Sequence, residues 1–215
     1  GEKFMIGGTG YWWQYDGELE GDYNISTYAL YAGYKFTPAV ALKAMYYWQS
    51  FSDDFKGQNF EGETSPKAWK AILDIKQEAL KFTSLWVEYS QQDNTFAGID
   101  SRYAIGGGSY DYAGRNFGYA DPHGTSKWWF ATAKQQWNDK WSTFLRYANV
   151  NYDTDGLDNA TEWGIGVGYQ YTPAVYFELA FDQVDHGNTD EYVVYDENLA
   201  RGKDHVLRFR TNVSF

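Results

Sequence analysis

The stretch "VLRFRTNVSF" occupies residues 206–215 and alternates strictly between two kinds of side chain. In an extended strand, Leu207, Phe209, Val213 and Phe215 would share one apolar face, and the opposite face would carry two arginines. A soluble β-sandwich buries such an apolar face, whereas an outer-membrane barrel turns it towards lipid and turns the polar face towards a water-filled lumen. The pattern in the rest of the sequence discriminates between these two folds.

The composition is unusual for a soluble domain. Of the 215 residues, 20% are aromatic, with 10 Trp and 20 Tyr, and the aliphatic residues are too sparse to form an ordinary core. No run of the chain approaches the roughly 20 apolar residues that a membrane helix needs. This pattern excludes helical membrane spans but leaves barrels open, because barrel strands alternate and average to near-neutral hydropathy.

Charge and cysteine content exclude several functions. The net charge of −11 argues against a nucleic-acid partner, because binding a phosphate backbone requires a basic surface. The chain has no cysteine, which removes disulfides, thiolate chemistry and cysteine zinc sites from consideration. It begins without a leader-like segment, so we expect that any signal peptide has already been removed from an exported form. No cofactor is expected.

Reading with a period of two divides the chain into ten segments, most of them ten to fourteen residues long. Soluble strands usually have five or six residues, whereas a strand tilted across a bilayer needs about 9 to 11. The segments run over 3–15, 24–37, 40–53, 66–77, 81–93, 126–137, 140–152, 160–172, 174–185 and 203–215.

Short and long connections alternate between these segments. The tight ones are "KFTPAV", "KQEALKF", "WNDKW" and "QYTPAV", and the others are longer and rich in Gly, Asp, Asn and Ser. Short turns at one end of the strands, long loops at the other, and aromatic residues near the strand ends are typical of transmembrane barrels. The sequence therefore predicts an all-β fold in one domain over 1–215, namely a transmembrane antiparallel up-and-down β-barrel of about ten strands. The same pattern also fits the C-terminal portion of a larger barrel of about sixteen strands.

Several stretches resemble a known family. The ending "DHVLRFRTNVSF" resembles the terminal signal that the outer-membrane barrel-assembly machinery reads, with Leu207, Phe209, Val213 and Phe215 as its apolar positions. The stretches "ALKFTSLWVEYSQQDNTF", "WSTFLRYANVNYD" and "EWGIGVGYQYTPAVYFELAFDQVDHG" resemble the barrel region of porins tethered by an S-layer-homology domain in double-membraned Firmicutes. Those porins carry a peptidoglycan-binding domain, a coiled-coil stalk and more strands than the ten counted here.

In a pore, charged side chains on the lumen face set the field that a passing solute meets. We expect these residues to line the lumen because a charge facing lipid at mid-bilayer would cost about 2–4 kcal/mol. Pairing among themselves is the alternative to a role in selectivity. The candidates are Lys43, Lys70, Asp74, Lys76, Glu88, Lys134, Arg146, Glu162, Glu178, Asp182, Arg208 and Arg210.

Two loops carry further charged residues. The segment 94–125 is too long for a simple connection, which favours a functional or disordered loop. It either folds into the lumen as a constriction or lies outside as a surface loop, and its charged residues are Asp100, Arg102, Asp111, Arg115 and Asp121. The acidic group Asp153, Asp155 and Asp158 lacks the closing Glu of a calcium loop, so we expect a surface turn and no metal.

These observations favour a bacterial outer-membrane porin that passes small hydrophilic solutes and ions by diffusion, and not an enzyme. Its expected partners are outer-membrane lipid, the barrel-assembly machinery, the solutes and, in one version, two further copies in a homotrimer. One alternative is a barrel protease with Asp185, His186, His123 and Asp121 at its rim. A structural or adhesive barrel with a closed lumen is the other.

Overall fold

The computed structural model describes residues 2–15, 23–53, 64–93, 95–96, 124–153, 155, 158–185 and 203–214. These residues form an almost entirely β structure, as the period of two predicts, and each strand matches its expected segment to within three residues. The strands are β1 (Phe4–Tyr15), β2 (Tyr23–Thr37), β3 (Val40–Phe51), β4 (Lys67–Ile75), β5 (Ser84–Asp93), β6 (Thr125–Gln136), β7 (Trp141–Tyr152), β8 (Ala160–Thr172), β9 (Val175–Asp185) and β10 (Lys203–Val213).

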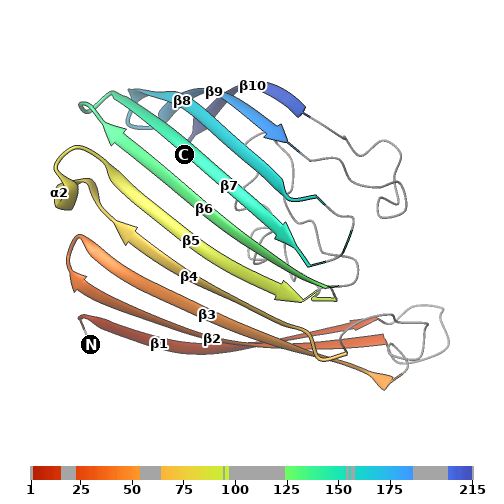
Figure 1. The fold of residues 1–215 in the computed structure, drawn as a ribbon. Coiled ribbons are helices and arrows are strands. Elements are labelled where there is room, and N and C mark those ends of the chain that lie inside the picture. The colour runs from red at the N-terminus through yellow and green to blue at the C-terminus, as the bar shows by residue number, and fades with distance from the viewer. Residues whose placement is uncertain are drawn as a thin grey trace.

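The strands form one antiparallel sheet in which every strand pairs with its neighbours in sequence, from β1 to β10. The short connections all lie at one end of the sheet, which we call the turn end, and the strand ends that the long connections join lie at the other, the loop end (Figure 1). Both Thr-Pro turns close in the same way: the hydroxyl oxygens of Thr37 and Thr172 accept hydrogen bonds from the backbone N–H groups of Ala39 and Ala174. The expected sorting of connections is confirmed for this sheet.

The connection between β4 and β5 contains α2 (Gln77–Leu80), a single helical turn. Lys81 ends it in the left-handed conformation, with a φ of 73°, and donates its backbone N–H to the carbonyl oxygen of Gln77. No helix in the described part of the chain is long and apolar enough to cross a membrane.

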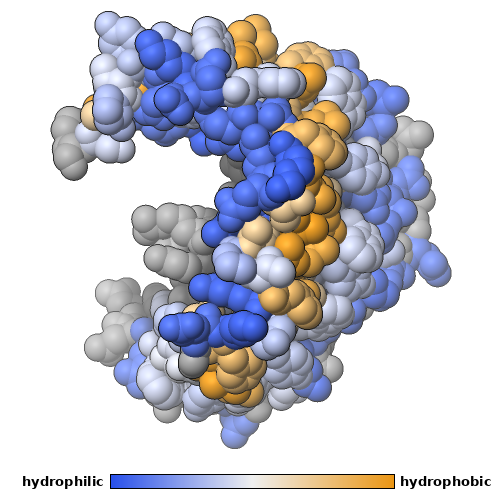
Figure 2. Space-filling model, turned by 90° about the vertical axis from the view of Figure 1, so that its left-hand side faces the viewer, coloured by the Kyte–Doolittle hydropathy of each residue, from blue (hydrophilic) through white to orange (hydrophobic). Residues whose placement is uncertain are grey.

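The sheet is curved but open, and this departs from the closed barrel that the sequence predicts. Within the described ranges, β1 pairs only with β2 and β10 pairs only with β9, so each leaves one edge of the sheet unpaired. Seen from the turn end, the molecule has the outline of a C (Figure 2). Alternation within a strand specifies its two faces but not the strand that its edge pairs with. The sequence pattern therefore could not predict that β1 and β10 each leave an edge unpaired.

Successive hairpins are staggered along the sheet. Ser84 at the start of β5 pairs with Lys134, and β6 continues two residues further, to Gln136. Trp141 at the start of β7 pairs with Tyr169, and β8 continues to Thr172. Such a stagger tilts strands relative to the axis around which the sheet curves, as it does in barrels.

The two faces of the sheet differ in chemistry. The convex face exposes large apolar side chains, among them Leu30, Leu145 and Ile165, each more than half exposed. The concave face buries charged and polar side chains such as Glu88 and Asp182. In Figure 2 a hydrophobic band runs along the sheet between hydrophilic margins. This is the reverse of a soluble domain, in which the apolar face is buried and the charged face is solvated.

Aromatic residues border the band on the convex face. The loop-side aromatic row consists of Trp12, Tyr28, Trp48, Trp69, Tyr89, Trp129, Tyr147 and Trp163. Its rings contact across strands, with centroids 6.2 Å apart for Trp12 and Tyr28 and 4.7 Å apart for Tyr89 and Trp129. Nearer the turns, the Trp141 and Tyr169 centroids are 4.5 Å apart. Only aliphatic residues and threonine separate the two borders on β7 and β8.

Candidate functional site

The concave face of the sheet is the candidate site, because it collects the charged residues of the strands. Eleven of the twelve predicted lumen residues lie in strands, and the strand registers place all eleven on this face. Lys76 is the exception: it follows the last residue of β4 and precedes the helical turn α2, so it belongs to the turn and not to the wall. Alternation placed Lys76 in line with Asp74 but did not show that the strand had already ended.

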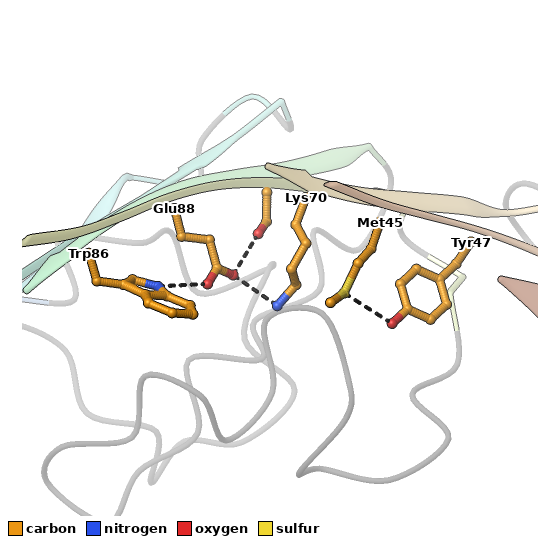
Figure 3. A network of polar contacts seen from close by, with 6 residues as sticks. Met45, Tyr47, Lys70, Trp86 and Glu88 are labelled. Atoms are coloured by element: carbon orange, nitrogen blue, oxygen red, sulfur yellow. Dashed lines mark hydrogen bonds and ion pairs between the residues drawn. The ribbon is translucent and has the colours of Figure 1, made fainter. Parts of the chain in front are cut away.

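Neighbouring strands bring opposite charges together on β3, β4 and β5. The Lys70 Nζ atom lies 2.8 Å from Glu88 Oε1, with both side chains at least nine-tenths buried. Glu88 also accepts hydrogen bonds from the Ser90 hydroxyl at 3.0 Å and from the Trp86 indole N–H at 3.3 Å (Figure 3). Glu88 therefore has three donors, which offset the cost of burying its carboxylate.

A second ion pair borders the first. Lys43 donates to Asp74 Oδ2 at 3.0 Å, and its ammonium lies 4.8 Å from the centre of the Trp86 ring. Both charged side chains are about one-third exposed. Lys43 therefore binds a carboxylate and an aromatic face at once, and the two pairs form a continuous network across three strands.

A further charged group lies on β7 to β10. Arg208 donates to Glu178 Oε1 at 3.3 Å, and the Arg146 guanidinium lies 4.0 Å from the centre of the Phe144 ring. Asp182 is fully buried, and neither of its carboxylate oxygens accepts a hydrogen bond from the described residues. Glu162, on β8, is also buried on this face. Three pairs of inward charges thus bind each other, as in the alternative to a role in selectivity.

Glycines on β8 let the side chains of neighbouring strands pack directly on the β8 backbone. A Cβ on Gly164 would overlap the Asp182 carboxylate, one on Gly166 would overlap the Phe144 ring, and one on Gly168 would overlap the Tyr176 hydroxyl. The large side chains of the neighbouring strands therefore lie flat over the β8 backbone. The alternation Gly-x-Gly-x-Gly in "EWGIGVGYQ" is the sequence signal for this close approach.

Two basic residues extend into the open space of the concave side. Lys134 and Arg210 are exposed, and the Lys134 ammonium lies 6.0 Å from the centre of the Tyr176 ring. The registers place Lys134 in one row with Phe144, Gly166 and the backbone of Arg208. Both cations are therefore more exposed than the Lys70–Glu88 and Arg208–Glu178 pairs.

Towards the loop end the concave wall carries an apolar cluster. A buried cluster there consists of Ala68, Phe96, Trp128, Phe130, Ala148, Val150, Ala160 and Val184, with Tyr47, Trp86 and Tyr152 packed against it. Phe96 follows β5, and its ring centroid lies 6.1 Å from that of Tyr47 on β3. Phe96 thus packs against the concave face. Sequence reasoning missed Phe96, because a single aromatic residue in a stretch without periodicity gives no signal.

The charged residues predicted for the segment 94–125, Asp100, Arg102, Asp111, Arg115 and Asp121, lie outside the described residues, as do His123, His186 and Phe215. Asp153 pairs with Lys127 at 2.8 Å, and Asp185 pairs with Lys203 at 3.4 Å, both on the convex face at the loop end. Among the side chains that the structure describes, no three His, Cys, Asp or Glu residues are placed to hold a metal ion. Leu207, Phe209 and Val213 lie on the convex face of β10, each at least half exposed.

No protein-family model matches the chain, and no curated protein matches it.

Proposed function

We propose that the sheet is the wall of an outer-membrane β-barrel porin, with its convex face against lipid and its concave face against water. The observation that carries the proposal is the inverted distribution of side chains. On the strands, charged residues reach the convex face only near the loop end, as at Lys127 and Asp185, while the middle of that face is apolar and exposed. Water gives an exposed apolar band no stability, whereas a bilayer does.

The dimensions of the band fit a membrane. On β8 the convex-face aromatics Trp163, Tyr169 and Tyr171 bracket Ile165 and Val167. Trp163 is six residues from Tyr169 and eight from Tyr171, which corresponds to about 20–27 Å along a strand. An outer-membrane barrel presents an apolar band about 25 Å tall between aromatic girdles. The aromatic borders would lie at the two headgroup regions, with the loop end outside and the turn end facing the periplasm.

Closure of the sheet is part of the proposal. In hydrocarbon each unpaired backbone group costs several kcal/mol, so β1 and β10 must pair there either with one another or with further strands. Ten strands place both termini at the turn end, and any even number of added strands keeps this arrangement. The first version is a narrow barrel of ten strands, and the second is a wider barrel to which these ten contribute the C-terminal part.

A closed, structural barrel is the second candidate function. It is favoured by the buried apolar cluster around Phe96 and Trp128, because a water-filled passage would not bury apolar side chains on its own wall. The two candidates share the membrane location and differ in whether ions pass.

Conductance separates the two candidates. The full-length protein, purified in detergent, is added to a planar lipid bilayer in KCl, and single-channel steps are recorded. Porin function predicts discrete, long-lived conductance steps that increase with salt concentration. A protein that is folded and inserted, as judged by protease resistance of its strands in the same lipid, and yet gives no steps would overturn the porin and support the closed barrel.

A further inference from the structure

Charges on the concave wall are segregated along the strands. Every basic residue that the structure places on this face lies within five residues of the turn end of its strand. These residues are Lys35, Lys43, Lys70, Lys134, Arg146, Arg208 and Arg210. The same half carries three acidic residues, Asp74, Glu88 and Glu178. Of the concave-face side chains described farther from the turns, Glu162 and Asp182 are charged, and both are acidic.

Each acidic residue of the turn-side half already forms an ion pair with a basic residue. Asp74 binds Lys43, Glu88 binds Lys70, and Glu178 binds Arg208. Asp182, just beyond this half, also interacts with Arg146 and Arg208. With Asp182 included, seven basic residues against four acidic ones leave an excess of three positive charges. The net charge of the chain, −11, does not reveal this, because the acidic excess lies elsewhere in the sequence.

The exposed Lys134 and the largely buried Arg208 lie on either side of a stretch of wall that carries no acidic residue in its row. Between Lys134 on β6 and Arg208 on β10, the row contains only Phe144, Gly166 and Ala180. Four strand spacings of about 4.8 Å separate the two backbones, or about 19 Å, and long Lys and Arg side chains reach into that space. Arg210 extends from the same strand as Arg208 and is exposed.

We propose that the turn-side half of the concave wall is an anion-binding section, which takes small solutes bearing carboxylate or phosphate groups. This inference rests on the proposed porin function and adds a solute class to it. Arginine and lysine bind such oxygen anions by charge-assisted hydrogen bonds. Within a Debye length of about 10 Å at 0.1 M salt, the excess positive charge also raises the local anion concentration. Glu162 and Asp182, which lie nearer the loops, produce a negative potential at the other end of the passage.

The test removes the two exposed cations together, as Lys134→Gln with Arg210→Gln. The full-length protein is recorded in a planar bilayer across a KCl gradient at low salt, with the dilute side facing the turn end. We expect the chloride-to-potassium permeability ratio to fall at least twofold, and we expect the difference to vanish near 1 M salt, where the Debye length is about 3 Å. Partial block of the current by inorganic phosphate added from the turn side should weaken in the same variant.

Two controls isolate the effect. Lys127→Gln with Lys203→Gln removes the same two charges from the convex face at the loop end, and it should leave the ratio unchanged. Arg210→Lys keeps the charge and should retain most of the phosphate block. Conducting channels whose ratio is unaltered in the wall variant, or altered equally in the convex-face control, would overturn the anion section and leave the porin standing. If the unmutated protein does not conduct, the proposed function itself fails.

Discussion

Substituting a single arginine on the convex face would distinguish a band that faces lipid from one that faces water. Leu145 lies on β7 between Trp141 and Tyr147, with its side chain 55% exposed. In water, Leu145→Arg at such a site should change stability by no more than about 0.5 kcal/mol. In a bilayer the same substitution places a charge near the midplane and should cost about 2–4 kcal/mol. That cost is about a 30- to 700-fold change in the folding equilibrium.

The matched control lies on the same strand and the same face. Asn149 is four residues from Leu145, about 13 Å along the strand. It pairs with Trp129 of the loop-side aromatic row, where headgroups are expected. Asn149→Arg should cost only about 0–1 kcal/mol there. Both variants are unfolded by urea in lipid vesicles and followed by tryptophan fluorescence. Equal, small costs at the two positions would refute the membrane assignment of the convex face.

Three further outcomes follow from the wall and its terminal strand. Glu88→Gln leaves a buried lysine without its counter-charge and should destabilise the protein by about 3–5 kcal/mol. Asp74→Asn, at a partly exposed pair, should cost at most about 1 kcal/mol. Similar urea midpoints for the two variants would contradict the burial argument. Gly166→Val must displace the aromatic ring that lies over it and should cost about 1–3 kcal/mol, while Gly33→Ala, whose Cβ would meet only ordinary contacts from 3.6 Å, should be nearly neutral in the same titration. Deletion of Phe215 should lower the amount of inserted protein more than its apolar area, worth about 1.5–3 kcal/mol, would suggest, and normal surface levels by antibody labelling would argue against a terminal assembly signal.

The sequence predicted the strands and their faces well, because alternation is a local property. Each of the ten segments appears as a strand, and the faces assigned to Glu88, Asp182 and Arg208 are those of the structure. Strand ends were harder to place, as Lys76 shows, because a turn can begin without breaking the alternation.

Relations between distant strands were not predictable in the same way. The register that joins Lys70 to Glu88 depends on the lengths of the connections, and single-strand patterns do not specify it. Phe96 follows β5 and contacts Tyr47 on β3, across the intervening strand β4, and no local pattern indicates this contact. The open edges of β1 and β10 have the same cause, since an edge is determined by what lies beside it.

The central claim is that the convex face contacts lipid and the concave face contacts water, and four consecutive residues of β6 test it most directly. The chain has no cysteine, so single variants Ala131→Cys, Thr132→Cys, Ala133→Cys and Lys134→Cys each report one position in proteoliposomes. An impermeant, water-soluble thiol reagent should modify Thr132→Cys and Lys134→Cys and spare the two alanine positions. A bilayer-dissolved quencher should act on a fluorescent label at the alanine positions alone. Equal reactivity at all four positions, or the opposite alternation, would contradict the account.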